Sequence, residues 1–199
     1  RSPQAWAQVS RGGPANGKLH LYFRPRNMTL IINGRFLTRP MTGVERVGRM
    51  LVDVIAEEWP DSRIAIPARC EIVGERPDLE IVPTGTTQGH FWEQMELPRI
   101  LEAGDVLLSP ANTGPLRCER HVPYIHDLAF VHHPEWFNAR FATWYRLLMP
   151  RLARKASCVL TSNALVARDL QRYFGLAEER IHVVPPYCNA PGRYGTTDH

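Results

Sequence analysis

Short apolar runs alternate with stretches of helical period along most of the chain. The run at 29–33 is of the buried-strand type, and apolar residues at helical spacing follow it at 42–58. The alternation continues, with further strands predicted at 63–66, 79–82, 105–109, 122–127, 157–161 and 181–185 and further helical segments at 90–101, 139–155 and 163–173. Strands joined by helices are typical of a parallel sheet covered on both sides. The pattern therefore predicts an α/β fold, a Rossmann-like, mostly parallel sheet with helices on both faces.

Two of the predicted helices carry signals at their ends. Thr42 to Glu45 match a capping box, in which the threonine hydroxyl and the glutamate carboxylate both bind free backbone N–H groups. Ser162 is expected to cap the start of the last helix, and Gly175 is expected to close its C-terminus. These signals predict where the loops before the two helices end.

The two ends of the chain lack a sustained period. Residues 1–27 are rich in Arg, Gly, Pro, Gln and Asn, which predicts a disordered basic extension. Residues 187–199 are predicted to be an irregular tail. The organised domain is therefore expected at 28–186.

The basic charge of the chain belongs to its first segment. The whole chain carries +4 and its pI is about 9.1, but residues 1–27 hold five basic residues and no acid, so residues 28–199 carry −1. A near-neutral domain argues against a nucleic-acid partner. The alternative, a basic arm that touches phosphate, predicts binding that disappears when residues 1–27 are removed.

Several protein classes are excluded by simple patterns. No run of 18 apolar residues could span a membrane, and no secretory leader is expected at the start. The four cysteines form no CxxC pair, which argues against a zinc ribbon, and Cys158 lies in an apolar run as a core thiol would. This usage fits a reducing compartment and predicts a cytoplasmic protein, with at most peripheral contact with the inner face of a membrane.

Candidate chemistry is expected in the loops that follow the strands, because ligands of open α/β sheets bind outside the carboxyl ends of the strands. The first such loop, 34–43, ends at Gly43, where a helix start with free N–H groups favours an anion. A helix start that binds nothing is the alternative. The loop is not a GxGxxG fingerprint, which argues against a dinucleotide site.

The loops at 110–115 and 126–134 hold the other candidates. Asn112 and Thr113 can bind sugar hydroxyls, although they are also ordinary turn residues. His126 and Asp127 stand where a buried strand ends, so the imidazole can exchange hydrogen bonds with a ligand while Asp127 fixes its tautomer or holds the loop. The alternative is a strand-end histidine whose partner is a backbone group.

A metal site is disfavoured. His126, Asp127, His132 and His133 lie within eight residues, but adjacent histidines usually point apart and the spacing matches no known metal pattern. The chain also lacks a DxD carboxylate pair that could hold a nucleotide-bound cation. Charged residues of the first two helical segments, namely Arg46, Arg49, Glu93 and Glu96, are expected mainly on solvated faces.

Several segments together resemble one family. Residues 34–47, GRFLTRPMTGVERV, resemble the first loop and helix of GT-B glycosyltransferases of the family 4 type. HFWEQMELP at 90–98 is similar to a segment of its mannosyltransferase-like members. Other similar segments follow in the family's order: Asn112-Thr-Gly-Pro, Ile125-His-Asp, 144–154, 159–163 and 179–185.

The resemblance implies two facing Rossmann-like domains with the active site between them. The N-terminal domain would mainly bind the acceptor and the C-terminal domain the nucleotide-sugar donor, and the reaction would be retaining and need no metal or other cofactor. His126 would contact the transferred sugar, with Asp127 beside it, and Gly43 would lie near the donor phosphates or the acceptor. Asn112 would line the acceptor side. Two more binding candidates stand in the resembling segments, Arg46 and Glu93.

The family's second domain, which supplies the basic residues for the diphosphate, has no counterpart here, and the paired glycines of the first loop are Thr42-Gly43. The chain is thus expected to be the acceptor-side domain of a glycosyltransferase and to have little activity alone. Its expected partners are a nucleotide sugar, with mannose the first choice, a glycan or lipid-linked acceptor and the missing C-terminal domain. A non-catalytic Rossmann-like binding or interaction module is the alternative.

Overall fold

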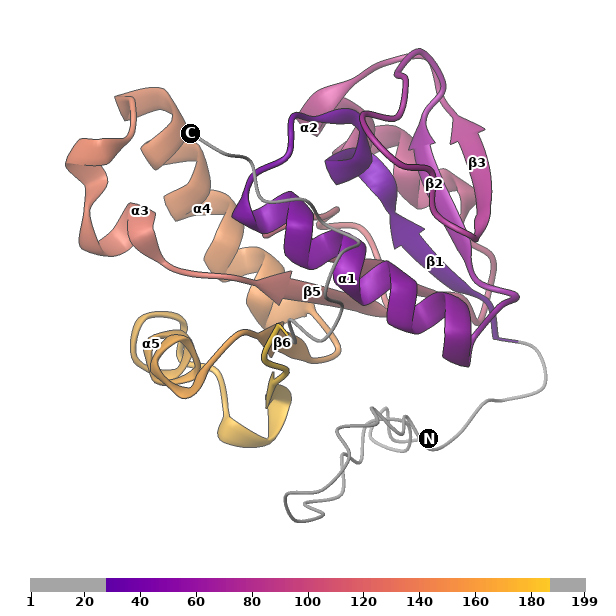
Figure 1. Ribbon diagram of the computed structural model, residues 1–199. Coiled ribbons are helices and arrows are strands. Elements are labelled where there is room, and N and C mark those ends of the chain that lie inside the picture. The colour runs from indigo at the N-terminus through magenta and orange to yellow at the C-terminus, as the bar shows by residue number, and fades with distance from the viewer. Residues whose placement is uncertain (1–27, 187–199) are drawn as a thin grey trace, which may run out of the picture.

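The computed structural model describes residues 28–186, which form an α/β domain around one seven-stranded sheet (Figure 1). Every neighbouring pair of strands is parallel. The predicted α/β class and parallel sheet are therefore confirmed, whereas the predictions for residues 1–27 and 187–199 lie outside the described residues. The strands are β1 (Leu30–Asn33), β2 (Arg63–Pro67), β3 (Glu80–Thr84), β4 (Val106–Ser109), β5 (His121–Ile125), β6 (Val159–Thr161) and β7 (Ile181–Val183).

The strand order is β3-β2-β1-β4-β5-β6-β7, so the chain builds outward from β1 to β3 and then returns to place β4 on the other side of β1. β1 and β4 pair with Ile31 opposite Leu107. The point where the strand order reverses opens a crevice at the carboxyl ends of the strands, and ligands bind there in open α/β sheets. We call this side of the sheet, where Asn33, Ser109 and Ile125 end their strands, the carboxyl edge.

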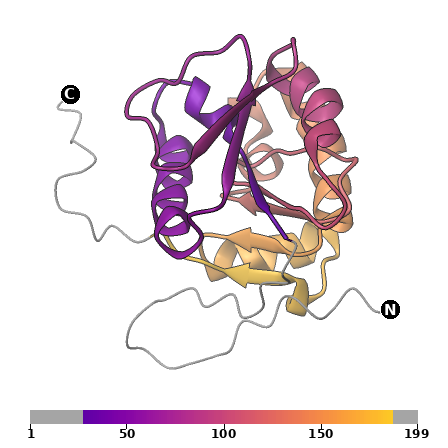
Figure 2. The same ribbon diagram turned by 90° about the vertical axis from the view of Figure 1, so that its right-hand side faces the viewer.

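Helices cover both faces of the sheet (Figure 2). One face carries α1 (Gly43–Glu58), and the other carries α4 (Ala139–Lys155) and a helical segment made of three short pieces. That segment runs through α2 (Gly89–Phe91), a π-helical turn (Trp92–Glu96) and a 3₁₀ turn (Leu97–Ile100). The remaining helices are α3 (Ala129–His132), α5 (Ala164–Phe174) and the 3₁₀ turns Gly34–Thr38, Pro134–Trp136 and Glu178–Arg180.

The central strands are apolar on both sides because both faces are covered. Ile32 and Ile64 pack in the same cluster as Val52 of α1. Their neighbours Ile31 and Ala65 point the other way, into a cluster that contains Trp92 and Leu97 on the opposite face. This arrangement explains why β1, β2 and β4 read as continuous apolar runs rather than as alternating ones.

A second cluster holds the later half of the domain. Met149 and Leu152 of α4 pack with Leu170 of α5 and with Val159 of β6. Cys158, next to Val159, is buried as predicted, and burial raises the pKa of its thiol to about 11. A thiol that stays protonated at neutral pH is a structural residue and not a nucleophile.

Two predicted caps are wrong in detail. Thr42 precedes α1 as expected, but its hydroxyl donates to the carboxylate of Glu45 instead of capping a backbone N–H group.

The N-cap of α5 is Asn163, whose side chain accepts from the N–H groups of Leu165 and Val166 at 2.9 and 3.0 Å. Ser162 instead donates to the carbonyl of His126, because the end of β6 lies beside that of β5. Gly175 closes α5 in the left-handed region, with φ 67°, as predicted.

Arg49 is not on a solvated face, contrary to the prediction. Its guanidinium is buried and donates to the carbonyl oxygens of Val73 and Glu75, because the loop between β2 and β3 folds back over α1. Arg49 lies on the same side of α1 as the buried Glu45 and Val52, and the sequence could not reveal the loop that covers it. Within residues 28–186, none of the helices is both long and apolar enough to cross a bilayer.

Candidate active site

The three loops chosen from the sequence lie together at the carboxyl edge. Arg35, just after β1, donates through Nη2 to Thr113 Oγ1 in the loop after β4 at 2.6 Å. Asn112 of the same loop accepts through Oδ1 from the backbone N–H of His126, after β5, at 2.8 Å. These two contacts tie the three loops to one another around the reversal point of the sheet.

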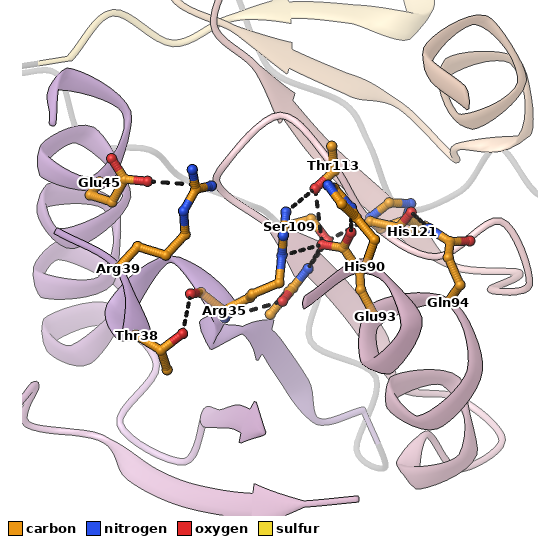
Figure 3. Close-up of polar contacts among 12 residues, drawn as sticks. Arg35, Thr38, Arg39, Glu45, His90, Glu93, Gln94, Ser109, Thr113 and His121 are labelled. Atoms are coloured by element: carbon orange, nitrogen blue, oxygen red, sulfur yellow. Dashed lines mark hydrogen bonds and ion pairs between the residues drawn. The ribbon is translucent and has the colours of Figure 1, made fainter. Parts of the chain in front are cut away.

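Glu93 lies at the centre of a buried polar cluster beneath these loops (Figure 3). Its Oε1 accepts from Asn33 Nδ2 at 2.8 Å and from Thr113 Oγ1 at 3.1 Å, and Arg35 Nε lies 3.3 Å away. Its Oε2 lies 3.2 Å from His90 Nδ1. The carboxylate thus joins the end of β1 and the loop after β4 to the start of the helical segment on the opposite face from α1.

The surroundings of Glu93 keep it ionised. Burial alone would raise the pKa of this carboxyl, but the charge of Arg35 and the hydrogen bonds from His90 and Asn33 outweigh burial, and the net effect lowers the pKa. The prediction that Glu93 belongs to a solvated face is therefore wrong, because the side chain is 1% exposed. Its contacts join the first loop, the loop after β4 and the helical segment, while its predicted role in binding donor or acceptor stays a prediction.

Ser109 and His121 form a second buried pair next to this cluster. His121 Nε2 lies 2.8 Å from Ser109 Oγ, which itself accepts from Asn33 Nδ2 at 3.3 Å. Ser109 Oγ therefore links Asn33 at the end of β1 to His121 at the start of β5. Burial lowers the pKa of His121 to about 4. Although a serine beside a histidine suggests nucleophilic catalysis, Ser109 is 0% exposed and no substrate can reach it.

His126 has a fixed ring, and one of its nitrogens bonds no residue of 28–186. Its Nε2 lies 2.7 Å from the carbonyl oxygen of Pro110, and its ring lies against that of Tyr124 with the centroids 4.6 Å apart. A carbonyl only accepts, so Nε2 carries the proton and Nδ1 of the neutral ring is an acceptor. Burial lowers the pKa of His126, partly opposed by the bond to Pro110 and the charges of Asp127 and Glu45, so the ring is neutral at pH 7. Nε2 thus has the backbone partner that the sequence analysis gave as the alternative. Nδ1 makes no hydrogen bond to any described residue.

Asp127 has the second of its two predicted roles. The exposed carboxylate accepts from the backbone N–H of Ala129 at 2.9 Å, which holds the loop at the start of α3. The tautomer of His126 is set by Pro110 instead. Asn112 also holds a loop, because its side-chain oxygen accepts from the backbone N–H of His126. Its own backbone is in the left-handed region, with φ 63°.

The start of α1 borders the same site. Gly43 is exposed, and a Cβ built on it would meet nothing within 4 Å, so its backbone is open to a ligand. Glu45 is buried two residues later and pairs with Arg39 at 3.7 Å. Arg46 is half-buried and makes no ion pair within the described part of the chain.

The four residues weighed as a metal site do not converge. His132 Nε2 lies 2.6 Å from Asp169 of α5, whereas His133 pairs with Glu135 at 3.2 Å and stacks on Trp136. Neither joins His126, which faces Pro110. Across residues 28–186, no three His, Cys, Asp or Glu side chains are grouped so that they could hold a metal ion.

Sequence reasoning missed five members of the site: Asn33, Arg35, His90, Ser109 and His121. Arg35 carried a usable signal, because it is a charged residue directly after a buried strand in a loop already chosen. Its partner Glu93 could not be found in the same way, since the two are far apart in sequence and meet only when β1 pairs beside β4.

Comparison with protein families gives a match over most of the domain. The model of the family described as Glycosyltransferase Family 4 matches residues 50–189, more than two thirds of the chain. The match includes the buried cluster from His90 onward, both loops at 110–115 and 126–134, and the elements from β3 to β7. None of the curated proteins compared with the chain matches it.

Proposed function

The chain belongs to glycosyltransferase family 4, and from that premise we propose that it is the acceptor-side domain of a retaining, metal-independent glycosyltransferase. The enzyme would transfer a sugar from a nucleotide-sugar donor to a glycan or lipid-linked acceptor. A second Rossmann-like domain facing the carboxyl edge would bind the nucleotide. Mannose is the first donor sugar to test, because the 34–47 and 90–98 segments resemble mannosyltransferases most.

One observation carries this proposal: at the carboxyl edge, one strand from the point where the strand order reverses, the neutral ring of His126 presents an Nδ1 that bonds no described residue. Glu45 lies close enough for its charge to act on His126, so the start of α1 is near this histidine. A neutral acceptor suits a hydroxyl of the transferred sugar. The open backbone at Gly43, at the positive end of α1, suits the donor diphosphate or an anionic acceptor group.

The other candidates take supporting roles. Arg46 lies one turn into α1 and would add positive charge near the leaving diphosphate. Glu93 and Thr113 position the loop after β4, and Asn112 positions His126. Asp127 holds the loop that follows His126. In this scheme the protein stabilises developing charge through groups that are already in place, and no metal-binding carboxylate pair takes part.

Nucleoside diphosphate release tests the proposal. The 199-residue chain and the complete product of its gene are each incubated with GDP-mannose and UDP-glucose, with and without candidate acceptors. We expect little or no turnover by the chain alone, diphosphate release by the complete product and no effect of EDTA. His126→Ala in the active form should lower turnover about 100-fold, which is typical for the loss of one preorganised contact.

Other results would overturn the proposal in distinct ways. Sustained turnover by the 199 residues alone contradicts the need for a second domain. Saccharide binding without consumption of any donor indicates the non-catalytic binding module instead. EDTA-sensitive turnover contradicts metal independence.

A further inference from the structure

A group of aromatic side chains flanks the buried polar cluster on the side of the sheet opposite α1. The rings of Trp144 and Tyr145, from α4, lie edge-on to His90, with centroids 6.1 and 6.3 Å from its ring. His90 also bonds Glu93 through Nδ1 (Figure 3). It therefore connects these two rings to the polar network under the loops. These rings stand beside the carboxyl edge, because Glu93 is bonded to Asn33 at the end of β1 and to Thr113 in the loop after β4.

His90 is held so that its other nitrogen is available. Glu93 is ionised and can only accept, so Nδ1 of His90 donates to it and Nε2 points away from this carboxylate. The side chain is about one third exposed, at 35%. No hydrogen bond to Nε2 is formed within the described part of the chain. The pairing of a buried carboxylate with a partly exposed imidazole fixes the direction in which Nε2 points.

The neighbouring rings supply the apolar surface that a sugar needs in addition to the hydrogen bond from or to His90 Nε2. A pyranose has C–H groups on its faces and hydroxyls at its rim, so it fits an aromatic face flanked by polar atoms. Trp144 is 41% exposed and offers such a face. Burial raises the pKa of Tyr145, so its phenol stays neutral, and it makes no hydrogen bond to any residue of 28–186.

We propose that His90, Trp144 and Tyr145 form the subsite for the acceptor sugar, with the pyranose against Trp144 and one of its hydroxyls hydrogen-bonded to His90 Nε2. The inference rests on the proposed function, because that function makes a sugar the acceptor. It assigns the acceptor to the α4 side of the site and leaves the α1 side, with His126 and Gly43, to the donor. Glu93 acts here as a positioning residue, since it orients His90 without touching the sugar.

Titration of the 199-residue chain with methyl glycosides of mannose, glucose and galactose tests the subsite. The readouts are the imidazole C–H signals of His90 in NMR and the fluorescence of Trp144. For a ligand of this size we expect at least one glycoside to bind with a Kd of about 1–10 mM. Both signals should move together along one binding curve.

Two substitutions of His90 separate binding from folding. His90→Asn keeps an amide N–H where Nδ1 donates to Glu93 but removes the outward nitrogen, so binding should weaken about three- to tenfold while the unfolding midpoint changes little. His90→Gln places its amide near Nε2 and should recover part of the affinity. Trp144→Ala should weaken binding to a similar extent.

His133→Asn is the matched control, because His133 is also a partly exposed histidine that bonds a glutamate, Glu135, and lies on a tryptophan, Trp136. It should leave the affinity unchanged. The inference is overturned if no glycoside binds up to about 50 mM, above the range expected for such a ligand, or if His90→Asn and Trp144→Ala bind as the natural chain does.

The two proposals can fail separately. A gene product that consumes a nucleotide sugar while the His90 signals ignore every glycoside overturns this inference alone. A chain that binds glycosides at His90, from a gene product that consumes no donor, overturns the proposed function alone.

Discussion

The guanidinium of Arg35 and the carboxylate of Glu93 form a buried ion pair, with Nε 3.3 Å from Oε1, that joins the first loop to the helical segment on the opposite face of the sheet from α1. Both side chains are largely removed from water, at 10% and 1% exposure. A buried charge is tolerated only when it is paired and hydrogen-bonded. Arg35 meets this condition because its Nη2 also donates to Thr113 Oγ1.

Glu93→Gln should therefore be strongly destabilising although it preserves size. All the groups around this carboxylate donate to it, so the new amide N–H₂ faces donors, and Arg35 loses its counter-charge. Breaking a buried pair from one side costs about 3–5 kcal/mol of the free energy of unfolding. Urea-induced unfolding followed by circular dichroism measures the loss.

The control is Glu80→Gln, which breaks the exposed pair of Glu80 with Arg63, 2.9 Å apart on the outer strands. An exposed pair contributes about 0–1 kcal/mol. Equal losses in the two variants would contradict the role given to the buried cluster.

The stability of the domain should also depend on pH through His121. Burial depresses the pKa of this histidine from 6.5 to about 4. Between these values the unfolded chain binds a proton that the folded chain does not, so the free energy of unfolding falls as the pH is lowered from about 6.5 to 4. A shift of this size corresponds to about 3 kcal/mol.

His121→Gln isolates this contribution, since a glutamine side chain can still form a hydrogen bond with Ser109 and does not titrate. Its free energy of unfolding should be flatter over the same window. Protonation of Glu93 lowers the free energy of unfolding separately, and only below pH 4.5, because its pKa in the folded chain is lowered from that value. Parallel curves for the two proteins between pH 6.5 and 4 would show that His121 is not the group responsible.

How much could be predicted from the sequence depended on whether a feature is local. The apolar runs at 29–33 and 105–109 predicted β1 and β4, because burial on both faces leaves a continuous signal. The loops after the strands were found from the same pattern. The buried partners of Glu93 and Arg49 were not, because their contacts depend on which strands are neighbours and how a loop folds back, and no spacing along the chain encodes either.

The cap of α5 shows the limit of local rules at the level of one residue. Ser162 and Asn163 both favour the N-cap position, so sequence alone could not rank them reliably. In the structure, Ser162 donates to the carbonyl of His126, whereas the Asn163 side chain accepts from the N–H groups of Leu165 and Val166.

Asn163→Ala should cost about 1 kcal/mol of the free energy of unfolding, since it leaves two N–H groups at the start of α5 without their acceptor. Asn163→Asp, which keeps an acceptor there, should restore most of that loss. The comparison is made by chemical denaturation of the two variants. A helix that tolerates alanine as well as aspartate at 163 would contradict the assignment of the cap.

The tautomer of His126 is the most direct test of how the site is prepared. Because Nε2 donates to Pro110, the ring should carry its proton on Nε2 and leave Nδ1 unprotonated. Nitrogen-15 NMR of the imidazole distinguishes the two nitrogens, and the pattern should persist at neutral pH because burial lowers the pKa of this histidine. Asn112→Ala, which removes the acceptor for the backbone N–H of His126, should disturb the ring, whereas Asp127→Ala should leave the tautomer unchanged because Asp127 bonds Ala129. A proton found on Nδ1 in the natural chain would mean that the acceptor nitrogen faces Pro110 and that His126 can offer the donor sugar only a proton.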